Sequence, residues 1–304
     1  MHEDLFAKSG LSLDRLRVLV AVANAGSIVK AAGDDPVRQS QYSRQLKELE
    51  TFFEQKLTQR KGRTLSLTPN GQRLANLARE HFNALAHFKA ESAEMPLTVR
   101  IGAGESLIKW LLIPSLCHIK AGRESVNWRF ANLQTPEIMD RLLDQRLDFG
   151  LVRGVEETPP LKSTRLGRLS NSLFVPGKMA VGMPTKPEAA IAQLPMAILE
   201  GRSRLRQMIE DGCRKANRRS DIRFECASQP EIAVIVRHGL AAGILPTLAK
   251  PDFAGSDVQV LDLSRMKVFD IELSLVWNPR ALALSEALEG IKDDLGRVLR
   301  CAGR

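Results

Sequence analysis

LDRLRVLVAVANAGSIVKAAGDDPVRQSQYSRQLKELETFFEQ, residues 13–55, decides the fold of the first part of this chain. Apolar residues recur at helical spacing over 13–24, which predicts an amphipathic helix. Ser12 is placed to cap the start of this helix, and Gly26 follows its end. The stretch therefore begins with a helix that buries one face.

A second, shorter helix and a tight turn follow. Ser27 can cap a helix over 28–32, and GDDP at 33–36 is a strong turn sequence. A longer third helix is expected over 39–55. Two short helices, a tight turn and a longer helix together predict a helix-turn-helix.

The third helix carries side chains suited to a DNA groove. Its expected apolar stripe is Tyr42, Leu46, Leu49 and Phe53, and about 100° per residue places Ser40, Arg44 and Lys47 on the opposite face. Arg and Gln can bond base edges, whereas Ser and Lys suit phosphates. The candidate DNA-binding residues are Ser27, Arg38, Gln39, Ser40, Gln41, Ser43, Arg44, Lys47 and Arg63. The alternative is a helix face that is polar only because it is solvated.

A basic turn and a short strand come next. QRKGR at 59–63 leads into the alternating TLSLT at 64–68, which is the pattern of a wing with Arg63 at its tip. Thr68 and Pro69 predict the start of a helix that runs to about residue 92. Its apolar positions form a coiled-coil seam, which predicts a dimerisation arm: Leu74, Ala78, His81, Leu85 and Phe88.

The remaining chain alternates strands and helices. Strands are expected at 97–103, 126–131 and 147–152, with helices at 106–121 and at 137–146, the second capped by Thr135. This order predicts a parallel α/β sheet. A second set is expected to hold strands at 178–183, 223–227 and 243–246 and helices at 205–217 and 230–238. Strands at 258–263 and 272–277 and a helix at 281–299 are expected to return to the first set.

The N-terminal part resembles the winged helix-turn-helix of LysR-type transcriptional regulators. The matching pieces are AGS at 25–27, AA at 31–32, SRQL at 43–46, LE at 49–50 and LTPNG at 67–71. RLL at 141–143, LDFGLV at 147–152 and GLAAGILP at 239–246 are similar to the family's two-lobed effector domain, which is similar to periplasmic solute-binding proteins.

The resemblance implies an α/β chain in three parts. These are a winged helix-turn-helix over 1–68, a linker or dimerisation helix over 69–94 and an effector domain over 95–304, with lobe I at about 95–170 and 258–304 and lobe II at about 171–257. Two positions near the N-terminal end of the third helix depart from the usual residues of the family. Asp35 occupies a position where the family usually has Leu, and RQS at 38–40 replaces the common Ser-Gln-Pro. These differences favour a short second helix and an altered base preference.

In a two-lobed domain of this kind the ligand lies between the lobes, at strand carboxyl ends and helix N-termini. The candidate effector-binding residues are Ser106, Asn132, Thr135, Arg153, Arg202, Ser203, Ser228 and Gln229. Ser106 and Thr135 suit a carboxylate but also fit plain helix caps. Arg153 or Arg202 can pair with an anion or lie solvated. Glu105 disfavours a carboxylate, so the charge of the effector stays open.

Composition bounds these interpretations. The net charge is +9, from 44 Lys and Arg against 35 Asp and Glu, and residues 1–90 hold 14 against 9. The first third is therefore richer in positive charge. No apolar run suits a transmembrane helix or a signal peptide, so a cytoplasmic protein is expected. The four cysteines are Cys117, Cys213, Cys226 and Cys301, and they form no CxxC pair. They are expected to be buried thiols, although a redox pair of Cys213 and Cys226 is conceivable.

The leading hypothesis is a sequence-specific transcriptional regulator modulated by a small molecule. Its expected partners are double-stranded promoter DNA, a small organic effector and further copies of itself as a dimer or tetramer, with RNA polymerase as another candidate. No membrane, cofactor or metal is expected. The alternatives are an architectural DNA-binding protein without an effector and a solute-binding protein, which leaves the first 90 residues unexplained. No nucleophile elbow, P-loop or HExxH supports an enzyme.

Overall fold

The computed structural model describes residues 3, 5, 9–61, 64–92, 96–119, 126–154, 158–201, 204–215, 220–264, 266, 271–283 and 285–302. The chain divides into two compact units, residues 1–95 and 96–304, and each is described by itself. Across the described ranges, no helix combines the length and the apolar character needed to cross a membrane.

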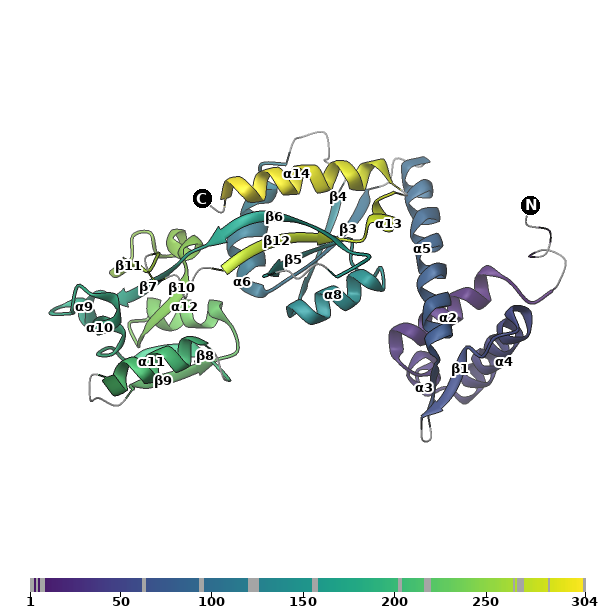
Figure 1. Cartoon of the computed structure of the whole chain (residues 1–304), viewed down its shortest axis with the longest axis horizontal. Helices are drawn as coiled ribbons and strands as arrows, with labels where there is room; N and C mark the ends of the chain where they lie inside the picture. Colours follow the sequence, from purple (N-terminus) through teal and green to yellow (C-terminus); the bar gives the residue numbers. More distant parts are fainter. Residues whose placement is uncertain are drawn as a thin grey trace. The chain divides into compact units, whose positions relative to one another are not determined.

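The N-terminal unit contains the two expected short helices, α2 (Leu13–Ala25) and α3 (Ile28–Ala32) (Figure 1). The hydroxyl of Ser12 accepts a hydrogen bond from the backbone of Arg15, and that of Ser27 accepts one from Lys30. Gly26 ends α2 in the left-handed region at φ 77°, where glycine carries no steric penalty. Both predicted helices and their caps are confirmed.

The third helix, α4 (Pro36–Phe53), starts earlier than the sequence suggested. The carboxylate of Asp35 accepts hydrogen bonds from the backbone of Val37 at 2.9 Å and of Arg38 at 3.3 Å. Pro36 occupies the first helical position, where its missing N–H has no intrahelical partner to lose. The expected start near residue 39 was therefore wrong, because the turn sequence is also a helix cap.

One core holds the N-terminal unit together. Leu19 of α2 and Leu46 and Leu49 of α4 are almost fully buried. The hairpin of β1 (Thr58–Lys61) and β2 (Thr64–Leu67) follows, and α5 (Pro69–Ser92) closes the unit. A Cβ on Gly71 would lie 2.1 Å from the carbonyl oxygen of Leu57, so only glycine lets α5 start this close to the hairpin.

The second unit contains two five-stranded sheets, one per lobe. The lobe I sheet has the order β4-β3-β5-β12-β6, in which β12 runs antiparallel to β5 and β6. Its strands are β3 (Leu97–Ala103), β4 (Val126–Asn132), β5 (Phe149–Arg153), β6 (Lys162–Leu169) and β12 (Ile271–Trp277). Its helical segments are α6 (Glu105–Leu107), the π-helix η1 (Ile108–Leu112), α7 (Ile113–Leu116), α8 (Thr135–Leu143), α13 (Pro279–Leu282) and α14 (Glu286–Ala302).

The lobe II sheet has the order β11-β7-β10-β8-β9, with β7 antiparallel to both of its neighbours. Its strands are β7 (Asn171–Pro176), β8 (Met196–Leu199), β9 (Ile222–Cys226), β10 (Ala242–Pro246) and β11 (Val258–Asp262). Its helices are α9 (Gly177–Ala180), α10 (Pro187–Ile191), α11 (Arg204–Lys215), α12 (Gln229–Arg237) and the 3₁₀ segment η3 (Thr247–Phe253). In Figure 1, β6 leads directly into β7 and so joins the two sheets.

The α/β architecture with two lobes is confirmed, but several elements differ from expectation. The strand expected at 178–183 is wrong, because the buried strand is β7 and the chain then turns through α9. The strand at 258–263 was expected in the first sheet, yet β11 pairs with β7 of the second. Thr135 does not cap α8 but is its first residue, after Gln134. The helix expected over 106–121 contains a π turn, and its described part ends at Leu116. Strands β6 and β8 were not anticipated.

Trp110 of η1 ties the two lobes together. Its side chain is 7% exposed and packs with the lobe II core that includes Phe174 and Phe253. Its indole Nε1–H donates to Asp252 Oδ2 at 3.0 Å, and the same oxygen accepts from Lys109 Nζ at 2.7 Å. An aromatic side chain of one lobe thus completes the core of the other.

Replacing Trp110 by alanine should therefore destabilise the second unit. Loss of a buried indole costs about 3–5 kcal/mol, measured as the shift in the denaturant midpoint of the full chain. Trp110→Phe should lose less, since it keeps a ring in the core and gives up the hydrogen bond. Val181→Ala, at a side chain that is 86% exposed, is the control. Equal midpoints for Trp110→Ala and Val181→Ala would contradict the interlobe role.

Candidate nucleic-acid interface and ligand cleft

The outward face of α4 presents the polar side chains that the sequence analysis selected. The exposed ones are Arg38, Ser40, Gln41, Arg44 and Lys47, and the partly exposed ones are Gln39 and Ser43. Ser27 lies apart from them, because it is 6% exposed and its hydroxyl caps α3. Arg63 lies outside the described residues. One helix therefore brings together seven of the nine candidates.

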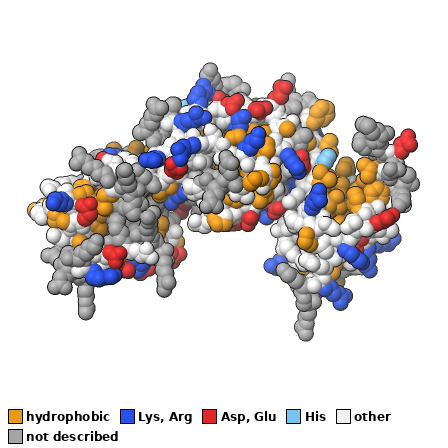
Figure 2. Space-filling view, viewed as in Figure 1, with side chains coloured by type: hydrophobic (Ala, Val, Ile, Leu, Met, Phe, Trp, Pro, Cys, Tyr) orange, Lys and Arg blue, Asp and Glu red, His pale blue; other side chains and the backbone are white. Residues whose placement is uncertain are grey.

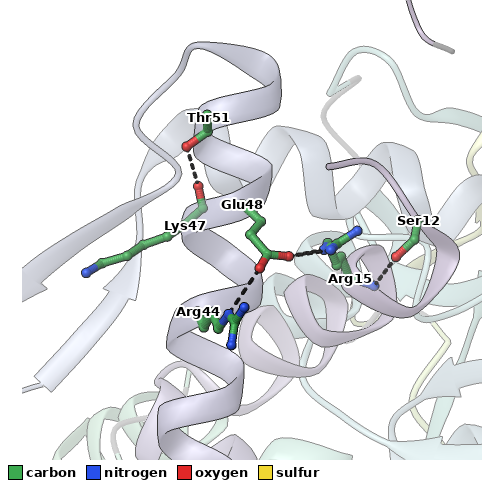
Figure 3. Close-up of polar contacts among 6 residues, drawn as sticks. All are labelled: Ser12, Arg15, Arg44, Lys47, Glu48 and Thr51. Carbon is green, nitrogen blue, oxygen red and sulfur yellow. Dashed lines mark hydrogen bonds and ion pairs between the residues drawn. The ribbon is translucent and has the colours of Figure 1, made fainter. Parts of the chain in front are cut away.

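Glu48 connects this face to α2, as Figure 3 shows. Its Oε2 accepts from Arg15 Nε of α2 at 2.5 Å, and its Oε1 accepts from Arg44 Nε at 3.3 Å. The hydrogen bond from Arg15 holds the pKa of the Glu48 carboxyl below its usual range, with Arg44 adding to the effect. Glu48 was not among the residues predicted from the sequence, although its spacing of four residues from Arg44 was a usable signal.

Two of the basic side chains on this face, Arg44 and Lys47, are held differently. Arg44 is paired with Glu48 but its side chain is 84% exposed, so its guanidinium remains open to a further partner. Lys47 extends away from the helix in Figure 3, and the bond drawn there joins its backbone carbonyl to Thr51 Oγ1 at 3.0 Å. An arginine oriented by a carboxylate suits base reading, and an exposed lysine beside it suits phosphate contact.

Glu50 fixes the other end of α4 to the hairpin. Its Oε1 accepts from the backbone N–H groups of Leu57 and Thr58, both at 2.9 Å, and from the Thr58 hydroxyl at 3.0 Å. One carboxylate therefore ties the start of the hairpin to α4. A third helix and a basic hairpin held in fixed relation are the parts of a winged helix-turn-helix head.

Helix α5 exposes apolar side chains along one side. Leu74 of the expected seam packs against the core of the head and Ala78 is buried, whereas Leu77, Leu85 and Phe88 are 49%, 53% and 68% exposed. In Figure 2 the hydrophobic side chains of this unit gather along and beside α5. Such a stripe on a long helix is suited to pack against another helix.

The second unit contains a cleft between its lobes with a cavity of about 160 Å³. Six of the eight effector-binding candidates line it: Ser106, Asn132, Thr135, Arg153, Ser228 and Gln229. Arg202 and Ser203 lie outside the described residues. The first turns of α8 and α12 border this cavity, so their free N–H groups add positive potential to it.

Arg153, at the carboxyl end of β5, dominates the electrostatics of the cleft. Its Nη2 donates to Ser106 Oγ of lobe I at 3.1 Å and reaches Gln229 Oε1 of lobe II at 3.5 Å. Burial lowers the pKa of its guanidinium. Within the described chain it makes no ion pair, so its charge is met by neutral oxygens only.

The other candidates differ in how far they are already engaged. The hydroxyl of Ser228 caps α12 by accepting from the Glu231 backbone at 3.5 Å. The hydroxyl of Thr135 has no hydrogen-bond partner among the described side chains and backbone groups. Glu105 also lines the cavity. Among its described lining residues, the cleft thus offers one partly buried cation, Arg153, at least one free hydroxyl and one carboxylate, Glu105.

The cysteines do not form a site in the described part of the chain. Cys213 and Cys226 are buried, and Cys117 is exposed. Burial, reinforced by the charge of Glu231, raises the pKa of the Cys226 thiol, which disfavours its reactive thiolate. In the same part of the chain, no group of three or more His, Cys, Asp or Glu side chains is arranged to hold a metal ion.

Comparison with known proteins gives two family matches. Residues 13–72 match the bacterial regulatory helix-turn-helix of the lysR family, and residues 93–296 match the LysR substrate binding domain. A probable hydrogen peroxide-inducible genes activator of Mycobacterium avium is 29% identical over 242 residues, 78% of each chain. An uncharacterised HTH-type transcriptional regulator, YfeR of Shigella flexneri, is 26% identical over 96% of each chain.

Solved structures of the same architecture cover nearly the whole chain. Full-length OxyR from Pseudomonas aeruginosa superimposes with a TM-score of 0.66 at 16% identity, covering 94% of each chain. LysG of Corynebacterium glutamicum with bound effector Arg gives a TM-score of 0.64 at 16% identity, covering 95% of this chain and 98% of that one. At these identities the likeness concerns the fold.

Removing the charge of Glu48 tests its hold on Arg44. Glu48→Gln should raise affinity for non-specific duplex DNA about two- to fivefold, because one opposing charge leaves the face and Arg44 is freed to meet a phosphate. The salt dependence of binding, measured by fluorescence anisotropy, should steepen by up to about one unit of slope.

Glu210→Gln is the matched control, since Glu210 of α11 also faces an arginine on its own helix, Arg206. It should leave both quantities unchanged. If Glu48→Gln instead weakened binding and lowered the melting temperature, the carboxylate would act mainly by holding α2 against α4.

Proposed function

This chain belongs to the LysR family of bacterial transcriptional regulators, and we propose that it reads its operator with α4 and responds to a small anion bound in the cleft around Arg153. The observation that carries the first part is the exposed polar face of α4, where Arg44 is ordered by Glu48 yet 84% exposed. A DNA partner also implies that the protein works in the cytoplasm.

The residues of α4 divide by role. Arg38, Gln39, Ser40 and Gln41 lie at the N-terminal end of the helix, the end that meets base edges when a recognition helix enters the major groove. Arg44 follows one turn later and can bond a guanine with both guanidinium nitrogens. Ser43 and Lys47 suit phosphate contacts, which set register. Arg63 of the wing is proposed to contact the minor groove.

The exposed stripe on α5 supports self-association. Leu77, Leu85 and Phe88 are apolar and open in the single chain, and a second copy of α5 offers the same stripe. Pairing these helices would bury them and place two reading heads on one DNA duplex, which suits a two-fold symmetric operator. We therefore propose that the regulator is a dimer or a higher oligomer.

The cleft favours a small organic anion, and the observation that carries this is Arg153. A guanidinium that is partly buried and met only by neutral oxygens gains most from a carboxylate, which can accept two parallel hydrogen bonds. Thr135 and the first turn of α8 are placed to donate to the same anion. Because Arg153 contacts Ser106 of one lobe and Gln229 of the other, its ligand would bias the relation between the lobes.

Arg44→Ala tests DNA reading. The full-length protein should protect a discrete site upstream of its own coding sequence, and the variant should bind this site about 5- to 100-fold more weakly with less preference over other DNA. The measurement is nuclease protection combined with anisotropy across a salt titration. Arg214→Ala, at a side chain 78% exposed on α11, is the control. Equal salt-sensitive binding by all three proteins would mean that α4 does not read bases.

Arg153→Gln tests the anion site. Among a panel of small carboxylic acids and amino acids, at least one should raise the melting temperature of the full chain, with about 2.7 kcal/mol of stabilisation at a hundredfold excess over Kd. The variant should lose this response, whereas Arg214→Gln should keep it. An undiminished shift in Arg153→Gln would remove Arg153 from the site. No shift in the wild type would favour a regulator that acts without an anionic effector.

A further inference from the structure

Val37 is an apolar side chain exposed at the reading end of α4. It is the second residue of the helix and its side chain is 67% exposed. Single exposed apolar residues are common on protein surfaces and need no explanation alone. What distinguishes Val37 is its place among the polar side chains of α4 that are proposed to contact DNA.

Helix geometry puts Val37 on the outward face. The buried Leu46 lies nine residues later, about 900° around the axis and so half a turn away. Arg44 lies seven residues later, within about 20° of the direction of Val37, and Ser40 is one turn away on the same side. A partner that touches Arg44 and Ser40 along the helix therefore meets Val37 as well.

The cap of α4 fixes the backbone that carries this side chain. The Asp35 carboxylate accepts from the Val37 backbone at 2.9 Å, and Pro36 restricts the preceding backbone dihedral. A β-branched side chain in a helix has one strongly preferred rotamer. Val37 thus projects from the capped end of α4 as a small apolar side chain. The carboxylate of Asp35 is engaged with the helix backbone.

The major groove offers one apolar group at the base edges, the C5-methyl group of thymine. The charged neighbours of Val37 on α4 are cations, Arg38 and Arg44, which suit a polyanion on either side of that contact. We propose that Val37 is a specificity-determining residue whose methyl groups pack on the C5-methyl of one thymine in each operator half-site. This inference rests on the proposed function of α4 as the reading helix.

Deoxyuridine substitution tests the contact atom by atom. In the operator defined by protection, each thymine of a half-site and its symmetry mate is replaced in turn by deoxyuridine, which removes only the methyl group. The wild-type full chain should lose about three- to tenfold in affinity at one position. Val37→Ala should bind the unmodified operator more weakly by a similar factor and be indifferent to deoxyuridine at that position. Val37→Thr, which keeps one methyl and the branch, should be intermediate.

Controls separate this contact from folding and from the broader function. Val181→Ala removes the same atoms from a side chain 86% exposed in lobe II and should keep the full deoxyuridine response. Val37→Ala should melt like the wild type. A wild type that is indifferent to deoxyuridine at every position, or a Val37→Ala variant that keeps the wild-type sensitivity, would overturn the proposal while the Arg44 result stands. Absence of any protected site would overturn both.

Discussion

The carboxylate of Glu50 is the interaction on which the reading head depends. One oxygen accepts three hydrogen bonds from the start of the hairpin, so a single carboxylate joins α4 to the wing. Charge-assisted bonds of this kind are stronger than neutral ones. Close contact of Gly71 with Leu57 then brings α5 to the same point. Helix α4, the wing and α5 therefore meet at one junction near Leu57 and Thr58. This junction helps to orient the outward face of α4.

The head could be predicted closely because its signals are local. Ser12, Gly26 and Ser27 act within four residues of their own positions, and the caps they form were readable from spacing alone. The hydrogen bond between Arg15 and Glu48 could not be predicted from spacing, since it joins residues on two different helices. The start of α4 was misplaced for another reason. Asp35 and Pro36 satisfy both a turn pattern and a helix-start pattern, and only the backbone geometry decides between them.

The second unit shows where local pattern stops being sufficient. The cleft residues were selected from positions where strands end and helices begin, and six of them line one cavity. It was harder to predict which of the two sheets each strand joins. β11 reads as a strand in either lobe, and its pairing with β7 depends on a partner far away in sequence. β7 itself is buried along its whole length, so it lacks the alternation that marks a half-exposed strand. Whether the cleft residues bind an effector depends on chemistry that neither spacing nor burial supplies.

The order of strands in lobe I has a consequence for synthesis on the ribosome. β12 lies between β5 and β6 in the sheet, yet it leaves the ribosome after every strand of lobe II. Lobe II can therefore pair its strands while lobe I still lacks a central one, and β5 and β6 must wait with open edges. The nascent chain passes through an interval in which its earlier lobe is the incomplete one. Premature termination between β6 and β12 would leave those edges exposed, a form expected to aggregate or to require a chaperone.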